Sequence, residues 1–438
     1  MLVSWVFLAL SVWGALWTWV SFHPPRRPAW FMFASFFAAW LTTELAPLHV
    51  LWQLAAVLIF VALGALESWA GWLGLVITLA SWGFLTVKVL GARRTDNIFS
   101  AALADALPVE IAPLATARQW DRIMLPFRIK RRGVKRVRDL QYVDGDQLRR
   151  HRLDVYMPKD GVEHAPVLLQ IHGGGWMIGD KREQGLPLMY HLASRGWVCV
   201  AINYRLSPKA TWPDHLVDCK RALAWIRAHI AEYGGDPDFV VATGGSAGGH
   251  LTAMMGLTAN DPAFQPGFES VDTSVQAMIP FYGVFDWTRS NGDRDNGLAD
   301  ILRRFIVKQR LSEAREVYER ASPLYRVGPD APPALVVHGD LDTLAPVTVA
   351  RAFVAKLREV SKNPVVYAEL HGAHHAFELF NSIRTMQAIT GVEAFLAWLR
   401  LGQAAPGAAP APAAGAPADT ASPDASANDR KSTAHTAR

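Results

Sequence analysis

The sequence predicts an α/β fold with a mainly parallel eight-stranded sheet, preceded by an all-α transmembrane region. From residue 134 to residue 402, short β-rich runs alternate with longer helical runs, which is the pattern of parallel strands covered by helices on both faces. Residues 1–91 are strongly apolar. Residues 403–438 are mostly Ala, Pro, Gly, Ser and Asp, and such a composition cannot bury enough apolar surface to fold, so we expect a disordered tail.

Two long apolar segments predict membrane-spanning helices. Leu2–Phe22 is an uncharged run of 21 residues, and at 1.5 Å per residue it spans about 30 Å, the thickness of the hydrocarbon core. Trp69–Leu90 carries only Lys88, near its end. A signal peptide at residues 1–22 is disfavoured, because there is no basic start or cleavage site and further apolar segments follow.

The stretch between these segments, residues 29–66, is apolar apart from Glu44. It fits either two short helices, at 29–45 and 47–66, or one span with a re-entrant piece. Residues 1–91 therefore predict three or four transmembrane helices.

Basic residues flank the apolar segments and bear on their orientation. Arg26–Arg27 and Arg93–Arg94 both belong in the cytoplasm by the positive-inside rule, which requires an even number of crossings between them. Three crossings in total satisfy both pairs. Residues 92–133 are expected to be a basic juxtamembrane linker, and the basic cluster within residues 128–138 fits either anionic lipid headgroups or solvent. We therefore expect an integral membrane protein with residues 134–402 in the cytoplasm.

Eight candidate strands follow residue 133. The segment Asp144–Asp146 between the first two reads as a hairpin turn, so we expect an antiparallel edge. Helical runs lie near residues 185–195, 214–233, 247–258, 346–361 and 383–400. The candidate strands are Val134–Val143, Arg152–Met157, Val167–His172, Val198–Tyr204, Phe239–Ala242, Ala277–Phe281, Ala334–His338 and Val365–Leu370.

The segment Gly244–Gly248 reads G-x-S-x-G between an apolar strand and a helix-like run. This context is typical of a nucleophile elbow, a tight turn that projects its serine at the carboxyl end of a strand. Ser246 is therefore the candidate nucleophile. The pattern alone is weak, because Gly- and Ser-rich turns are common, so it needs a base, an acid and an oxyanion hole.

Candidates for the acid and the base follow two later strands. The acid is Asp340 or Asp342, which point the same way in an extended chain, so geometry does not choose between them. His371, His374 and His375 lie just after the last strand. The order serine, acid, histidine is that of α/β hydrolases and differs from the chymotrypsin and subtilisin orders.

The segment His172–Trp176 contains three consecutive glycines after the third strand. Bare backbone there can point N–H groups at a developing oxyanion, together with the residue after the nucleophile, Ala247. Gly174, Gly175 and Ala247 are the candidate oxyanion donors. A phosphate-binding loop is disfavoured, because neither a Lys-Ser/Thr ending nor a G-x-G-x-x-G spacing is present.

These motifs, taken in order, resemble the hormone-sensitive-lipase-like branch of the α/β hydrolases, especially its bacterial BD-FAE-type esterases. The resemblance covers residues 134–400 and leaves out the membrane region and the tail. The matching segments are His172–Trp176 with Gly179–Lys181, Asn203–Pro208, Asp218–Cys219, Gly244–His250, Asp342–Leu344 and His375–Phe377.

The resemblance implies the identity of the remaining site residues. The family places its acid before a small residue and Leu, which selects Asp342, and its histidine before a small residue and Phe, which selects His375. It also implies hydrolysis of carboxylic esters, through an acyl-enzyme on Ser246, without a metal or an organic cofactor. A small-molecule or lipid ester is then the expected substrate, with membrane lipids as partners and a bacterial inner membrane as the location.

Alternatives remain at the level of function. Gly179–Lys181 also resembles formamidases, so an amidase is open, and a non-catalytic scaffold would be expected to have lost part of the site. A pI near 9.2 fits anionic membranes, and we expect no nucleic-acid partner because no aromatic-basic motif accompanies it. Phe285, Trp287 and residues 289–310 could form a lid or acyl pocket, or belong to the core.

Overall fold

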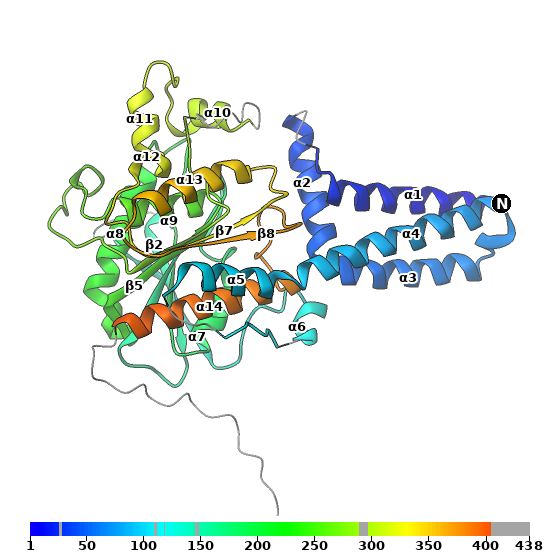
Figure 1. Ribbon diagram of the computed structural model, residues 1–438, viewed down its shortest axis with the longest axis horizontal. Coiled ribbons are helices and arrows are strands. Elements are labelled where there is room, and N and C mark those ends of the chain that lie inside the picture. The colour runs from blue at the N-terminus through cyan, green and yellow to red at the C-terminus, as the bar shows by residue number, and fades with distance from the viewer. Residues whose placement is uncertain are drawn as a thin grey trace, which may run out of the picture. The chain divides into compact units, whose positions relative to one another are not determined.

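The computed structural model describes residues 1–25, 29–108, 112–117, 119–143, 145, 149–288 and 297–403 (Figure 1). The chain divides into two units, Met1–Leu396 and Ala397–Arg438. The first unit contains Ser246 and the other candidate site residues. The expected tail lies outside the described residues from residue 404 onward.

One eight-stranded sheet forms the centre of the predicted catalytic part, residues 134–402, in the order β1-β2-β4-β3-β5-β6-β7-β8. Strands β3 to β8 are parallel, and β2 runs antiparallel to both of its neighbours. All eight predicted strands and the antiparallel edge are confirmed, although Asp144 and Asp146 of the expected turn lie outside the described residues. The strands are β1 (Val134–Gln141), β2 (Arg152–Pro158), β3 (Ala165–Ile171), β4 (Val198–Ile202), β5 (Gly235–Gly245), β6 (Ala277–Phe281), β7 (Ala334–Gly339) and β8 (Val365–Leu370).

The inner strands are buried on both faces. Every residue of β3, β4 and β7 is buried, as expected for parallel strands that have helices on either side. Figure 1 shows α8, α9 and α13 on one side of the sheet and α7 and α14 on the other. These five helices are α7 (Leu186–Ala193), α8 (Asp214–His229), α9 (Ala247–Leu257), α13 (Val347–Val360) and α14 (Ile383–Gln403), at the predicted helical runs.

Short elements that the sequence pattern did not indicate connect these helices and strands. They are α10 (Leu298–Ile301), a π-helical turn (Leu302–Ile306), α11 (Arg315–Arg320), α12 (Pro323–Arg326) and the 3₁₀ turns Arg149–His151 and Pro262–Phe264. A further 3₁₀ turn, Ile230–Tyr233, follows α8 within the predicted run 214–233.

The predicted membrane region contains α1 (Leu2–Phe22), α2 (Ala29–Glu44), α3 (Ala46–Ala62) and α4 (Trp69–Ala92), with a 3₁₀ turn at Ala65–Glu67. In the described chain, two helices are long and apolar enough to cross a membrane, and α2 and α3 together make a possible third span that is bent by 87°. The structure thus has two short helices between α1 and α4. The number of crossings stays a prediction, and three is the most that these helices support.

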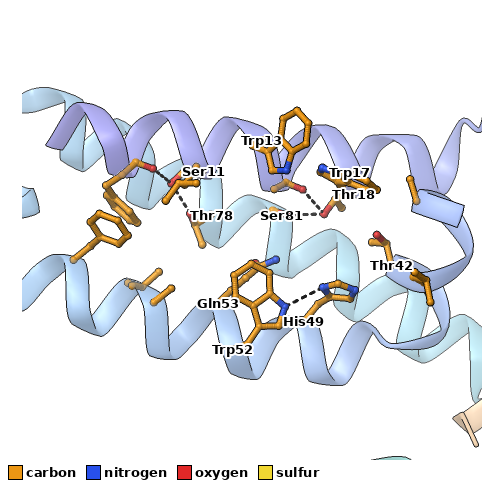
Figure 2. A pocket seen from close by; sticks show the side chains of 18 residues that line it. Ser11, Trp13, Trp17, Thr18, Thr42, His49, Trp52, Gln53, Thr78 and Ser81 are labelled. Carbon is orange, nitrogen blue, oxygen red and sulfur yellow. Dashed lines mark hydrogen bonds between the residues drawn. The ribbon is translucent and has the colours of Figure 1, made fainter. Parts of the chain in front are cut away.

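The interior of this helical bundle is lined with small polar side chains (Figure 2). Thr78 of α4 donates a hydrogen bond to Ser11 of α1 at 3.0 Å, and Thr18 and Ser81 pair at 2.7 Å. Such pairs keep polar groups satisfied where water is scarce, and the small side chains let two helices approach closely. A cavity of about 320 Å³ lies among α1, α2, α3 and α4.

Residues 92–133, the expected linker, contain α5 (Thr95–Ala106) and α6 (Trp120–Met124). The ring of Phe99 lies so close to Gly391 of α14 that a Cβ there would overlap it. Thr116 donates to Asp96 at 2.6 Å and to Thr390 at 2.9 Å. The described part of this segment is therefore packed on the catalytic part, while the domain boundaries remain a prediction.

Candidate active site

Ser246 lies on the sharp turn between β5 and α9. Its backbone has φ 60° and ψ −121°, a conformation that costs a non-glycine residue energy and that is typical of functional turns. The neighbouring Gly244 and Gly248 both lie against the carbonyl oxygen of Ile171, where a Cβ would overlap it. The G-x-S-x-G spacing is thus required by the close approach of strand β3 to the turn.

Asp342 and His375 meet at the carboxyl ends of β7 and β8. His375 Nδ1 lies 2.7 Å from Asp342 Oδ2. The other oxygen, Asp342 Oδ1, accepts hydrogen bonds from the backbone N–H groups of Leu344 and Ala345, each at 2.8 Å. Asp342 is fully buried, so these contacts fix its carboxylate and, through it, the orientation of the imidazole ring.

The charge state of Asp342 follows from its surroundings. Burial alone would raise the pKa of this carboxyl, but the charge of His375 and the hydrogen bond from it hold the pKa below its ordinary value. Nε2 of His338, a second buried imidazole, lies 3.6 Å from Asp342 Oδ2, the oxygen that is paired with His375. Asp342 is therefore a stable anion beside His375.

The neighbouring acid and histidines have other partners. Asp340 Oδ2 lies 3.1 Å from Nδ1 of the exposed His371. His374 Nε2 lies 2.9 Å from the carbonyl oxygen of Ser21, at the end of α1, and burial lowers the pKa of His374 to about 3. Of these two acid–histidine pairs, Asp342–His375 is the buried one.

The glycine loop is braced from several directions. The backbone N–H of Gly173 donates to Gln184 Oε1 at 2.6 Å. Burial lowers the pKa of His172 to about 4, so this imidazole is neutral, and its ring stacks on Tyr204 at a centroid distance of 4.4 Å. Gly174 has φ +112°, and a Cβ there would overlap the carbonyl oxygen of Ile178, which explains the glycine.

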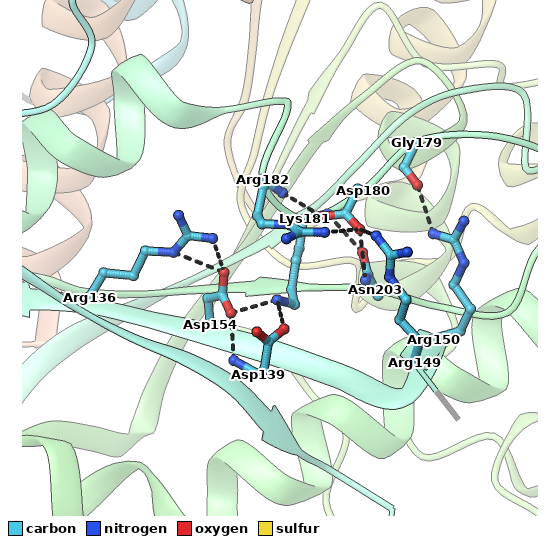
Figure 3. Close-up of polar contacts among 10 residues, drawn as sticks. All are labelled: Arg136, Asp139, Arg149, Arg150, Asp154, Gly179, Asp180, Lys181, Arg182 and Asn203. Carbon is cyan, nitrogen blue, oxygen red and sulfur yellow. Dashed lines mark hydrogen bonds and ion pairs between the residues drawn. The ribbon is translucent and has the colours of Figure 1, made fainter. Parts of the chain in front are cut away.

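A buried ionic network supports the far end of this loop (Figure 3). Lys181 Nζ lies 2.6 Å from Asp154 and 2.7 Å from Asp139, and Arg136 also pairs with Asp154. Asn203 accepts a hydrogen bond from the backbone N–H of Lys181 at 2.7 Å. The Gly179–Lys181 and Asn203–Tyr204 segments noted in the sequence therefore hold the glycine loop against β1 and β2.

A largely apolar cavity of about 430 Å³ lies in front of Ser246, within the size range of small-molecule sites. Both Ser246 and His375 line it. So do Gly174 and Gly175, while Ala247 begins helix α9 directly after the serine. The other lining residues are Phe33, Phe36, Phe37, Trp40, Trp176, Met177, Ile178, Gln184, Tyr282, Val284, Leu298, Ile301, Leu344, Ala345, Ala376 and Leu379.

The sequence-based candidates for a lid or acyl pocket have mixed outcomes. Phe285 is buried and stacks on Phe353 at 4.3 Å, and Trp287 packs among other tryptophans, so both belong to the core. Within residues 289–310, Leu298 and Ile301 line the cavity. Residues 289–296 lie outside the described residues.

The sequence did not indicate two groups of residues at the cavity. One is the aromatic face of α2, whose apolar composition is the same as that of a lipid-facing helix. The other is Tyr282, which lines the cavity, with its partner Glu378, which does not: the tyrosine hydroxyl donates to the carboxyl of Glu378, and the tyrosine ring lies 4.5 Å from that of His375. The motif His375–Phe377 directly precedes Glu378, and that proximity was the available signal.

Comparison with known proteins agrees with this geometry. The BD-FAE family model matches residues 153–357. The probable carboxylic ester hydrolase LipM of Mycobacterium tuberculosis is 47% identical over 77% of this chain and 80% of its own length. Esterase LipQ of the same organism is 43% identical over 70% of this chain and 75% of its own length.

Solved structures show the same fold. The butyrate-bound esterase Est2 of Thermogutta terrifontis has a TM-score of 0.51 and 25% identity, covering 63% of this chain and 97% of Est2. The sheet order and the serine turn define an α/β hydrolase. The chain belongs to the BD-FAE-type carboxylic ester hydrolases of this fold.

Proposed function

We propose that this ester hydrolase is a membrane-anchored serine esterase with Ser246, His375 and Asp342 as its catalytic triad. The observation that carries the proposal is that Ser246 and His375 line one cavity. Within that arrangement, Nδ1 of His375 is paired with Asp342 at 2.7 Å. His375 Nε2 is then the nitrogen left to act on the serine.

The proposed reaction has two steps. His375 takes the proton of Ser246 as its Oγ attacks the ester carbonyl carbon, and then gives that proton to the leaving alcohol. Water repeats the sequence on the acyl-serine and releases the carboxylic acid. Asp342 stabilises the imidazolium that forms at each step without taking its proton.

The oxyanion of each tetrahedral intermediate is proposed to lie among the N–H groups of Gly174, Gly175 and Ala247. The left-handed backbone of Gly174, at φ +112°, and of Gly175, at φ +59°, turns the loop beside the serine. Ala247 adds the N–H at the start of α9, where the helix dipole also favours a negative charge. Loss of one such donor typically costs about 3 kcal/mol of transition-state stabilisation.

Labelling of the full-length protein with a fluorophosphonate probe tests the triad. We expect wild-type protein to be labelled, and Ser246→Ala to lose labelling and more than about a thousandfold of its ester hydrolysis. Ser194→Ala, at an exposed serine directly after α7, is the matched control and should keep both. Full activity in Ser246→Ala would overturn the proposal.

The membrane arrangement is a second part of the proposal. If α1, α3 and α4 cross the bilayer and α2 does not, two crossings separate Arg26–Arg27 from Arg93–Arg94, and the positive-inside rule places both pairs in the cytoplasm. The catalytic part would then face the cytoplasmic side of a bacterial inner membrane, in contact with its lipids. A C-terminal reporter that is active only outside the cytoplasm should be inactive, and an active one would reverse this orientation.

A further inference from the structure

The second helix of the membrane region, α2, forms one wall of the catalytic cavity. Its side chains Phe33, Phe36, Phe37 and Trp40 line the cavity that contains Ser246. These positions follow the spacing i, i+3, i+4 and i+7, so they lie on one face of the helix. The ring of Phe36 meets that of His375 edge-on, at a centroid distance of 6.0 Å.

This position of α2 is fixed by buried polar contacts with the catalytic part. Glu44, at the end of α2, pairs with Arg384 of α14, and the side chains of both are 1% exposed. Ser382 also donates to Glu44, at 2.7 Å, and Trp40 packs on Phe380 at 5.2 Å. A buried acid that is paired in this way holds its helix in register, because separating the pair would leave two uncompensated charges.

The opposite face of α2 belongs to the membrane region. Ala38, Leu41 and Thr42 line the separate cavity among α1, α3 and α4 (Figure 2). The 16 residues of α2 span about 24 Å at 1.5 Å per residue, less than the roughly 30 Å of a hydrocarbon core. Because it also meets α3 at 87°, α2 lies along the membrane plane if α3 crosses the membrane.

We propose that the aromatic face of α2 binds the apolar chain of an ester that enters the cavity from the bilayer. The substrate class is a lipophilic ester whose chain contacts Phe33, Phe36 and Phe37 while its carbonyl carbon lies at Ser246. Water cleaves the acyl C–O bond and yields a carboxylic acid and an alcohol. This inference rests on the proposed serine esterase function.

Phe33 and Phe37 can be truncated with little expected effect on folding. Phe33 and Phe37 are 49% and 52% exposed, so truncating them removes cavity wall without opening a core. The matched control is Phe84→Ala in α4, where the phenylalanine is 58% exposed and lies away from the catalytic cavity. All three proteins are purified as full chains and placed in nanodiscs.

The measurement is kcat/KM on two series, p-nitrophenyl esters of increasing acyl length and alkyl acetates of increasing alcohol length. In the wild type we expect one series to rise roughly fourfold for each methylene that enters the cavity. In Phe33→Ala/Phe37→Ala the ratio of the long to the short ester in that series should fall at least about tenfold, whereas Phe84→Ala keeps the ratio. An unchanged ratio in the double variant would overturn the proposal.

The route from the bilayer needs a second measurement. A slowly exchanging long-chain fluorogenic ester is placed either in the same proteoliposomes as the enzyme or in separate vesicles. Entry from the bilayer predicts hydrolysis at least tenfold faster in the shared membrane, and equal rates would overturn that route. A failure of the proposed triad can be distinguished from a failure of this inference. If the triad is wrong, Ser246→Ala hydrolyses even the shortest ester at the wild-type rate, whatever the ratio of long-ester to short-ester hydrolysis.

Discussion

The catalytic cavity has two walls of different origin. The wall formed by the sheet carries Ser246 and His375, on turns at the carboxyl ends of parallel strands. The wall formed by α2 is aromatic and comes from the predicted membrane region. The difference teaches that the candidate polar groups for the reaction belong to the α/β domain, whereas the apolar lining of their cavity comes in part from the N-terminal helices.

The largest effect is expected at the acid of the sheet wall. Asp342→Asn should lower kcat by about 10⁴-fold, because the amide no longer favours the imidazole tautomer needed for catalysis. Asp340→Asn is the matched control, since Asp340 pairs with the exposed His371 instead. Initial rates on a short p-nitrophenyl ester provide the measurement. Equal losses in the two variants would contradict the assignment of Asp342.

The buried ion pair between Glu44 of α2 and Arg384 of α14 should show the next largest effect. Arg384→Leu leaves Glu44 buried without its partner, and removing one member of a buried ion pair typically costs about 3–5 kcal/mol. The double variant Glu44→Leu/Arg384→Leu should recover much of that stability, because both charges are gone. Denaturant unfolding in detergent micelles measures both variants. A double variant as unstable as the single one would show that the charge left behind is not the cause.

Glu378, behind His375, should make stability depend on pH. Burial raises its pKa to about 7, although the hydrogen bond from Tyr282 acts to lower it. In the folded protein Glu378 thus keeps a proton that it releases near pH 4.5 in the unfolded chain, so the contribution of this carboxyl to stability should fall between about pH 4.5 and pH 7 and then level off. The difference between these pKa values corresponds to roughly 3 kcal/mol.

Glu378→Gln should remove that contribution, because the amide does not titrate, so from pH 5 to pH 8 the unfolding free energy of the variant should rise more, or fall less, than that of the wild type. Glu359→Gln, at an exposed position of α13, is the matched control and should keep that contribution. Unfolding free energies of the full chain at pH 5 and pH 8 suffice for the measurement. An identical pH dependence in Glu378→Gln and the wild type would contradict the assignment.

The smallest effect is expected at the brace of the glycine loop. Gln184→Leu removes the acceptor for the Gly173 N–H, a loss worth about 1 kcal/mol, or about fivefold in kcat. Gln309→Leu, at an exposed position, should leave the rate unchanged. A rise in KM without a fall in kcat would show that Gln184 contacts substrate and does not position the loop.

The sheet and the sheet wall of the cavity could be predicted from local sequence. The inner strands β3, β4 and β7 are short apolar runs, and the serine turn needs Gly244 and Gly248 because strand β3 passes too close for a Cβ. Both features are visible in the residue types of a short segment. Chain geometry did not choose between Asp340 and Asp342, because residues two apart point the same way. The family resemblance selected Asp342, and the fold shows that Asp342 meets His375 whereas Asp340 meets His371.

The α2 wall could not be predicted for a related reason. An apolar helix of a membrane region has the same composition whether it faces lipid or a catalytic serine, so hydropathy alone does not distinguish them. Glu44 was visible in the sequence as an isolated acid in an apolar stretch, but its partner Arg384 lies 340 residues away. Such a pair is formed only when the chain folds.

The sequence by itself determined the class of fold, the order of the motifs and the apolar character of the first 91 residues, because strand period, tight turns and hydropathy act over neighbouring residues. Tertiary structure alone decided how Lys181 braces the glycine loop and that α2 closes the cavity, and it brought together Asp342 and His375, which the family resemblance had selected. These depend on side chains from distant segments being desolvated together, and only the packed chain brings them within contact distance.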